Sequence, residues 1–277
     1  MIPLRDTIPH RRTPVITWAL IAINVAVFLF ELTLGAESLQ RIFETFGLVA
    51  VRFTDPLWSS EAGIPAGNTI SIFASTFLHL NWVHLLANMW TLWIFGDNVE
   101  DRMGHARFLL FYILTGLLAA IVHCLIQSHS AVPAIGASGS VAGVLGAYLM
   151  LFPRARIVVA IPVLFFLFFA TLPAIFYLLI WFGSQVISGT LASLGGENID
   201  KVAWWAHIGA FLAGVAICRD FLLPAPPPIL KPRFEVHWPR LSQQKWPGRD
   251  RLPSHRFARQ DGIAPILSRF SHRSARG

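Results

Sequence analysis

Six stretches of apolar residues, several of them long enough to cross a lipid bilayer, constrain this chain more than any other feature of its sequence. A helix that spans the hydrocarbon core needs about 20 predominantly apolar residues. The stretches occupy residues 15–34, 82–95 with an apolar lead-in from residue 70, 108–126, 138–152, 164–187 and 203–221. Only 13% of all residues are charged, against roughly a quarter in soluble proteins. The sequence therefore predicts an all-α membrane protein, a bundle of six transmembrane helices.

The positive charges lie mainly on one side of these six stretches. An even number of crossings places both termini on the same side, and nearly all Arg and Lys residues then fall on that side; the exceptions are Arg41, Arg52 and Lys201. An excess of Lys and Arg in cytoplasmic segments is typical of membrane proteins. The sequence therefore predicts cytoplasmic N- and C-termini. This topology accounts for the net charge of +7 without a nucleic-acid partner.

Changes in composition along the chain predict three parts. Residues 1–14 form a basic cytoplasmic N-terminus, residues 15–221 the membrane domain, and residues 222–277 a basic cytoplasmic tail rich in Pro and Arg. Segments of the last kind often lack a packed fold, so the tail is expected to be disordered. It either stays in solvent or contacts anionic lipid, where each Lys or Arg gains about 1 kcal/mol. The long outer connection, residues 35–68, is expected to contain short interfacial helices.

Four polar residues of the apolar stretches are predicted to lie at a similar depth, in the outer half of the bilayer. His84 and Asn88 are four residues apart on the second stretch, so they share one helix face. Ser138 begins the fourth stretch, and His207 lies near the outer end of the sixth. Polar groups within a membrane span are costly and are often functional. A hydroxyl, an imidazole base and two further hydrogen-bonding side chains are the groups that acyl transfer requires.

Small residues recur at every fourth position on the two stretches that carry the hydroxyl and the base. They are Gly139, Gly143 and Ala147 on the fourth stretch, and Ala206, Ala210 and Gly214 on the sixth. Small residues at this spacing let two transmembrane backbones approach closely. The pattern predicts close packing of the fourth and sixth helices, which would bring Ser138 within reach of His207.

Three short motifs carry a resemblance to a known family. They are His79-x4-His84-x3-Asn88-Met89, before and within the second stretch, Gly136-Ala137-Ser138-Gly139 at the start of the fourth, and Ala206-His207-Ile208-Gly209 on the sixth. In their order and relative position these motifs resemble those of the rhomboid intramembrane serine proteases. The resemblance also includes Glu100, Gly104, Trp181-Phe182 and Gln185, and it covers residues 15–221.

The resemblance implies a role for each residue of the predicted site. Ser138 attacks the scissile carbonyl, and His207 accepts its proton, as a dyad without an acidic partner. His84, Asn88 and the backbone N–H of Ser138 form the oxyanion hole. The implied activity is that of an intramembrane serine endopeptidase, which hydrolyses peptide bonds in or near transmembrane segments of other membrane proteins.

Other residues of the motifs have supporting roles, and one position departs from the family pattern. The resemblance implies that Gly136 lets the loop before the fourth helix bend into the oxyanion hole, that Gly139 belongs to the same supporting motif, and that His79 is structural. Some family members carry a tyrosine one turn after the nucleophile, stacked against the catalytic histidine. This chain has Ala142 there, so another residue is expected to pack against His207.

The resemblance also implies how a substrate enters. In this family the fifth span and its flanking loop are thought to admit the substrate helix sideways, which assigns gating to Trp181, Phe182 and residues 184–202. The expected partners are membrane lipids and single-span proteins whose helices unwind easily. No organellar transit pattern is visible, so the sequence predicts a multi-pass protein of a bacterial cell membrane. The sequence does not specify the oligomeric state.

Three other interpretations use the same residues. A metal site of His79, His84 and His207 is disfavoured because no Asp, Glu or Cys joins them, so neither a metal nor a cofactor is expected. A non-catalytic protein that binds transmembrane helices remains an alternative, although such relatives typically lose the serine or the histidine. A transporter with a histidine proton relay would need an intramembrane acid or an inverted repeat, and neither is evident. His123, inside the third stretch, is expected to be a packed histidine without a catalytic role.

Overall fold

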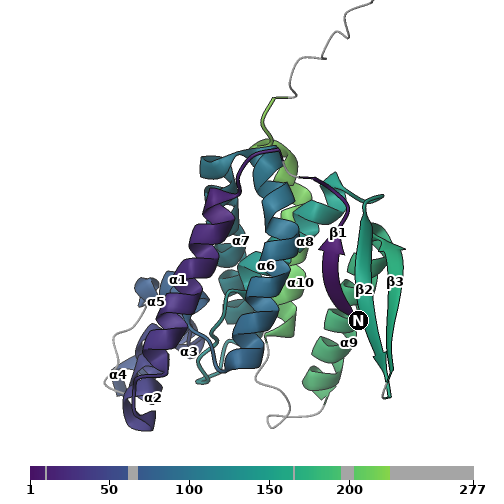
Figure 1. Cartoon of the computed structure of the whole chain (residues 1–277). Coiled ribbons are helices and arrows are strands. Elements are labelled where there is room, and N and C mark those ends of the chain that lie inside the picture. The colour runs from purple at the N-terminus through teal and green to yellow at the C-terminus, as the bar shows by residue number, and fades with distance from the viewer. Residues whose placement is uncertain (10, 62–67, 165, 195–202, 225–277) are drawn as a thin grey trace, which may run out of the picture. The chain divides into compact units, whose positions relative to one another are not determined.

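The computed structural model describes residues 1–224 except residues 10, 62–67, 165 and 195–202 (Figure 1). In chain order the elements are β1 (Ile2–Asp6), α1 (Val15–Glu31), α2 (Ala36–Phe46), α3 (Val51–Thr54), α4 (Pro56–Glu61), α5 (Thr69–Ala74), η1 (Ser75–Phe77), α6 (Trp82–Met103), α7 (His105–Ile126), α8 (Ser138–Leu151), β2 (Arg156–Val163), β3 (Phe166–Pro173), α9 (Ala174–Leu194), α10 (Trp204–Ile217) and η2 (Cys218–Phe221). Helices dominate, as predicted. The predicted tail lies outside the described residues from residue 225 onward, so its disorder stays a prediction.

Two of the described helices, α7 and α9, are long and apolar enough to cross a membrane. A third crossing is obtained if the helices over Thr69–Phe77 and Trp82–Met103, which meet at a bend of 88°, are counted as one span. Two further apolar helices, α1 and α8, are shorter. The predicted count of six crossings therefore stays a prediction.

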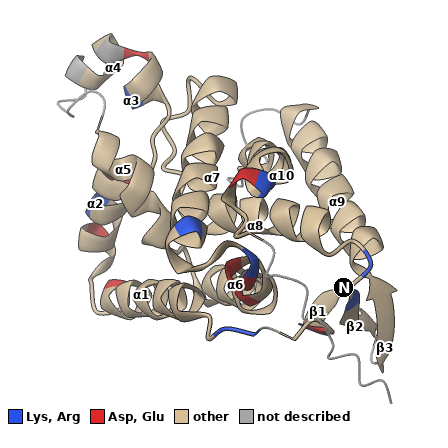
Figure 2. Ribbon diagram, turned by 90° about the horizontal axis from the view of Figure 1, so that it is seen from above, with Lys and Arg blue, Asp and Glu red and all other residues tan. Residues whose placement is uncertain are grey.

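The helix that carries Ser138, α8, lies in the middle of the bundle, with α6, α7, α9 and α10 around it (Figure 2). Every residue from Ser140 to Tyr148 on α8 is buried. Small residues such as Ala142 and Gly146 on this helix leave room for neighbours on all sides. The start of α8 is therefore held in place by the helices that surround it.

Local sequence signals set both ends of α6. The side-chain oxygen of Asn81, the residue before the helix, accepts a hydrogen bond from the backbone N–H of His84 at 2.9 Å, which is an N-cap. At the other end Gly104 has a φ of +77°, a conformation that glycine adopts without steric cost. The next residue begins α7. These signals fix His84 in the first turn of α6.

A buried carboxylate on α6 holds the start of α1. The residue before α1 is Pro14, which makes no side-chain cap. Instead the carboxylate of Glu100 accepts hydrogen bonds from the backbone N–H groups of Ile16 (2.9 Å) and Thr17 (2.8 Å), and from the Thr17 hydroxyl (2.7 Å). His105 Nδ1 lies 2.6 Å from the same carboxylate. Negative charge at a helix N-terminus is favourable, so Glu100 ties α1 to α6.

We expect Glu100→Gln to lower the free energy of unfolding by about 1–3 kcal/mol, because an amide group turned toward the N–H groups of α1 leaves a buried donor unpaired. Glu100 is only 1% exposed, so water does not replace the lost bond. The measurement is the midpoint of thermal unfolding in detergent. The matched control is Glu37→Gln, which breaks an exposed pair with Arg41 and is expected to cost less than about 1 kcal/mol. Equal effects of both changes would show that Glu100 does not anchor α1.

The expectation of an all-α fold is wrong for two segments, which form a three-stranded antiparallel sheet in the order β1-β2-β3. One strand comes from the predicted basic N-terminus. The other two form a hairpin whose second strand takes up the first part of the predicted fifth span, residues 164–187, so that α9 begins only at Ala174. Val and Ile recur through β2, and these β-branched residues favour strands. Periodicity alone cannot separate a short apolar strand from a buried helix segment.

The first strand, β1, packs along α6 from Trp90 to Asn98. The carboxylate of Asp6 accepts hydrogen bonds from Asn98 Nδ2 at 2.8 Å and from the hydroxyl of Tyr148. The indole N–H of Trp90 donates to the carbonyl of Pro3 at 2.6 Å. On its other side β1 pairs with β2, so it lies between α6 and the hairpin (Figure 2). The sheet thus closes this flank of the bundle.

Candidate active site

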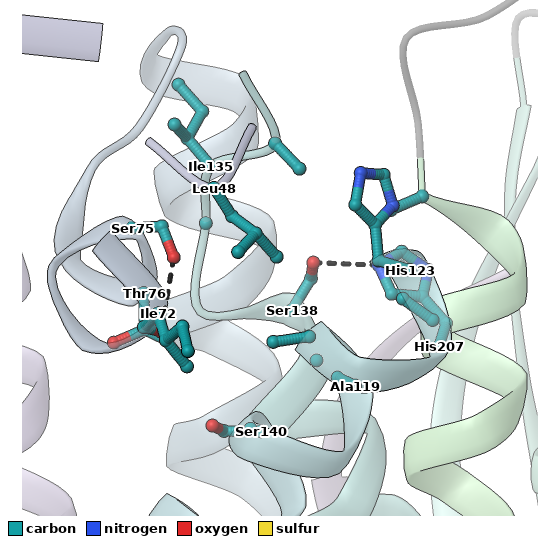
Figure 3. Close-up of a pocket in the computed structure, with 17 residues that line it drawn as sticks. Leu48, Ile72, Ser75, Thr76, Ala119, His123, Ile135, Ser138, Ser140 and His207 are labelled. Atoms are coloured by element: carbon teal, nitrogen blue, oxygen red, sulfur yellow. Dashed lines mark hydrogen bonds between the residues drawn. The ribbon is translucent and has the colours of Figure 1, made fainter. Parts of the chain in front are cut away.

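The structure brings Ser138 and His207 into hydrogen-bonding contact. Ser138 is the first residue of α8, and its Oγ lies 2.7 Å from Nε2 of His207. His207 lies in the first turn of α10 and is only 8% exposed. Figure 3 shows the bond at the edge of a pocket. A hydroxyl within this distance of an imidazole nitrogen can transfer its proton to that nitrogen.

The other ring nitrogen of His207 has a partner on a third helix. His207 Nδ1 lies 2.9 Å from the side-chain oxygen of Gln185 on α9. The ring of Trp204 meets the imidazole edge to face, with centroids 6.2 Å apart. Because Ala142 stands one turn after the nucleophile, another residue was expected to pack against His207. Gln185 and Trp204 are the residues that do so. The signal for Gln185 was a long amide side chain within an apolar stretch, the same signal that selected the other site residues.

Glycines let α8 and α10 approach each other until their backbones touch. A Cβ atom built on Gly214 would overlap the carbonyl of Gly143, and one built on Gly146 would overlap the carbonyl of Phe211. The predicted close packing of these helices is therefore confirmed. The predicted contact residues on α8 (Gly139, Gly143 and Ala147) are wrong in part. Gly139 faces Ala119 on α7, and Gly146, which was not among them, packs against α10.

The loop before α8 passes close to both residues assigned to the oxyanion hole. Gly136 has a φ of +122°, a backbone conformation that residues other than glycine rarely adopt. A Cβ atom at this position would lie 2.6 Å from Cε1 and Nε2 of His84 and 3.7 Å from Nδ2 of Asn88. Asn88 is 6% exposed, and its Nδ2 has no hydrogen-bond partner among the described residues. A free amide donor therefore lies beside the loop that leads into Ser138.

His79, the first histidine of the motif His79-x4-His84, lies against the second. The ring of His79 is buried and lies 5.1 Å from that of His84, measured between centroids. Its backbone N–H donates to the carboxylate of Glu31 at 3.4 Å, and its Nδ1 lies 3.3 Å from the carbonyl of Phe77. His79 makes no contact with Ser138 or His207 in the described hydrogen bonds. Its position fits the structural role that the resemblance implies.

A cavity of about 50 Å³ adjoins the serine and the base (Figure 3). A single water molecule needs roughly 10–15 Å³ on this measure, so several can enter. Leu48 lines the cavity from the outer connection, Ile72 and Ser75 line it from α5 and η1, and Gly116 and Ala119 line it from α7. The predicted short helices of the outer connection are present as α2, α3 and α4, and the segment between α2 and α3 contributes Leu48 to the cavity.

His123 also lines this cavity. The sequence predicted a packed histidine, and the ring is indeed buried, with an Nε2 that has no partner among the described residues. Within the described part of the chain, no three His, Cys, Asp or Glu side chains are placed to hold a metal ion. The polar side chains that line the cavity are the hydroxyls of Ser75, Thr76, Ser138 and Ser140 and the imidazoles of His123 and His207.

The residues assigned to gating lie partly outside the described chain. Trp181 and Phe182 on α9 pack against Phe211 of α10, with ring centroids 5.7 Å and 5.0 Å apart. The predicted gating segment, residues 184–202, includes residues 195–202, which fall outside the described residues. Helix α9 therefore contacts the helix that carries the base.

Comparisons with known proteins identify the family of this chain. The Rhomboid domain model matches residues 66–222. The chain is 30% identical to rhomboid-like protein 11, chloroplastic, of Arabidopsis thaliana over 135 residues, which cover 49% of this chain and 41% of that protein. It is 32% identical to rhomboid protein 1, mitochondrial, of Saccharomyces cerevisiae over 146 residues, 51% of this chain and 38% of that protein.

A bacterial relative is also found. Rhomboid protease GluP of Bacillus subtilis is 30% identical over 137 residues, 49% of this chain and 24% of that protein. The matched region thus spans about two fifths of the length of the first two relatives and about a quarter of the third. Since the domain model matches more than half of the chain and contains the whole Ser138–His207 contact, this protein belongs to the rhomboid family of integral membrane proteins.

Proposed function

We propose that this protein is an intramembrane serine endopeptidase that hydrolyses peptide bonds in or near the transmembrane segments of single-span membrane proteins. The observation that carries the proposal is the 2.7 Å contact between Ser138 Oγ and His207 Nε2. The name of one relative, a rhomboid protease of Bacillus subtilis, supports the same activity. The dyad needs neither a metal nor a cofactor to activate the serine.

The proposed first step forms an acyl-enzyme. His207 Nε2 takes the hydroxyl proton of Ser138 while Oγ bonds to the scissile carbonyl carbon, and the carbonyl oxygen becomes negatively charged. Donors from Asn88, His84 and the Ser138 backbone stabilise that charge; such a donor contributes about 2.7–4 kcal/mol in known cases. The peptide C–N bond then breaks, and His207 returns the proton to the leaving amine.

The proposed second step uses a water molecule from the cavity. His207 accepts a proton from the water, whose oxygen bonds to the acyl carbon, and the bond from that carbon to Ser138 Oγ breaks. The serine takes the proton back, which restores the starting state. The cavity beside Ser138 and His207 is large enough to supply this water.

The membrane topology is part of the proposal. We propose six crossings formed by α1, α6, α7, α8, α9 and α10, with cytoplasmic termini and with Ser138 in the outer half of the bilayer. The relatives include chloroplastic and mitochondrial proteins, so they do not support the predicted bacterial cell membrane. The proposal is a multi-pass location with lipids and single-span proteins as partners, in a membrane that is left unassigned.

The test uses purified wild type and Ser138→Ala in detergent, each incubated with a labelled single-span substrate and with a fluorophosphonate probe. We expect wild type to release a cleaved product and to carry the probe on Ser138, and the variant to do neither. Cleavage by both proteins would refute the assignment. Neither cleavage nor labelling by the wild type would favour the alternative, a protein that binds transmembrane helices without cutting them.

A further inference from the structure

We propose that Gln185 is a positioning residue that fixes the orientation and the tautomer of His207, so that the working unit is Ser138–His207–Gln185. The inference rests on the proposed function, because it concerns the same base. It changes the dyad implied by the resemblance into a three-residue unit whose third member is a neutral amide on α9. The contact between His207 Nδ1 and the Gln185 side-chain oxygen, 2.9 Å, is the starting observation.

The chemistry of the amide decides which nitrogen of His207 carries the proton. An amide oxygen only accepts hydrogen bonds, so Nδ1 must bear the hydrogen that joins it to Gln185. The lone pair of a neutral imidazole then lies on Nε2, which faces the hydroxyl of Ser138 at 2.7 Å. This is the tautomer that can accept the serine proton.

A neighbouring serine fixes which end of the amide faces His207. Gln185 Nε2 lies 3.2 Å from Ser184 Oγ, and the Ser184 hydroxyl donates to the backbone carbonyl of Trp181 at 2.6 Å. The Ser184 hydroxyl is therefore committed as a donor to α9 and is free to accept from the amide N–H. This leaves the amide oxygen to accept from His207. The hydrogen bonds therefore connect the α9 backbone, Ser184, Gln185, His207 and Ser138 in that order.

Both residues of the contact are buried, and Gln185 is not among the residues that line the cavity beside Ser138 and His207. Gln185 is 6% exposed and His207 is 8% exposed. In a buried site no solvent molecule replaces a lost partner, so an unpaired Nδ1 would be costly. Rotation of the imidazole or a change of its tautomer would then lower the free energy of the site. Burial makes the Gln185 contact decisive for the position of the base.

The packing of α9 against α10 explains why the amide reaches the base. Trp181, Gln185 and Gly189 are four residues apart, so they lie on one face of α9. Each of them meets one residue of α10. The rings of Trp181 and Phe211 lie 5.7 Å apart, and Gln185 contacts His207. A Cβ atom built on Gly189 would lie 3.2 Å from Trp204 Cβ. The antiparallel register of the two helices therefore places Gln185 opposite His207. A slip of one residue would rotate the amide by about 100° away from the base.

The test compares Gln185→Leu, which removes the acceptor while it keeps much of the bulk, with Gln185→Glu, which keeps a side-chain oxygen. The matched control on the same helix is Thr190→Val, which removes a hydroxyl that donates to the carbonyl of Val186 within α9. We expect Gln185→Leu to lower kcat and the rate of fluorophosphonate labelling about tenfold, the effect of one hydrogen bond, with KM unchanged. Gln185→Glu should restore most of the rate, and Thr190→Val should behave as wild type.

A spectroscopic readout separates positioning from a loss of structure. With 15N-labelled histidine, wild type should show His207 protonated on Nδ1, and Gln185→Leu should show a mixture of tautomers. A wild-type rate and an unchanged tautomer in Gln185→Leu would overturn the inference. If Gln185→Leu does not fold, failure of Gln185→Glu to hold the Nδ1-protonated form would overturn it. An inactive, unlabelled wild type would instead refute the proposed protease function.

Discussion

Loss of Ser138 and His207 together is expected to slow cleavage no more than loss of either residue alone. Each single change, to alanine, should lower kcat by a factor on the order of 10⁶, because residues that act as one unit in a serine protease show losses of this size that do not add. The hydroxyl has no base to take its proton without His207, and the base has no nucleophile to activate without Ser138. Their 2.7 Å contact places them in one proton-transfer step.

The measurement is the initial rate of cleavage of a labelled single-span substrate by the two single variants and the double variant in the same detergent. His129→Ala is the matched control, since it removes an exposed histidine outside the site, and it should cleave at the wild-type rate. Losses that multiply in the double variant would mean that the two residues act in separate steps. The Ser138–His207 contact would then not be the catalytic one.

A single methyl group at Gly136 is expected to lower kcat by about 10²–10³, the effect of one lost oxyanion-hole donor. In Gly136→Ala the new Cβ atom would lie 2.6 Å from the His84 ring, which must then move. The backbone would also leave its φ of +122°, which disfavours any residue with a Cβ atom. Both effects displace the loop that carries the Ser138 N–H. The measurement is kcat together with the rate of fluorophosphonate labelling.

The control for this change is Gly183→Ala on α9, where a Cβ atom would meet nothing within 4 Å. Alanine favours a helix over glycine by roughly 1 kcal/mol, so this variant should be at least as stable as wild type and equally active. Gly136→Ala should still purify as a folded protein, which thermal unfolding in detergent would establish. A folded Gly136→Ala with wild-type kcat would remove Gly136 and His84 from the oxyanion hole.

The residues of the site could be predicted because each is a polar side chain in an otherwise apolar stretch. Ser138, His207, His84 and Asn88 all carried this signal, and the structure places them around one cavity or along the loop beside it. Gln185 carried the signal too, but its partner could not be identified, because that depends on the register of α9 against α10. The register between two helices is set by how their side chains pack against each other, so it cannot be predicted from the sequence of either helix alone.

The sheet could not be predicted for a different reason. No residue from Ile157 to Gly183 is charged, so the sequence shows one long apolar run where the structure has a strand pair followed by a helix. Besides β3, strand β2 pairs with the short segment Ile2–Asp6, which contains Pro and charged residues and has few features of a strand. Its pairing depends on Asp6 contacts with α6 and α8, which only the folded bundle provides.

The sheet also determines the order in which the molecule can be assembled during synthesis. Ile2 pairs with Ala160, so β1 is synthesised more than 150 residues before its partner strand. By then α1, α6, α7 and α8 have all been synthesised. Strand β1 contacts α6 on one side and β2 on the other, so its contacts are incomplete until β2 has been synthesised. Strand β1 is thus synthesised before α1 but can reach its final place only after α8, and it closes a flank of the bundle to which α9 and α10 are still to be added.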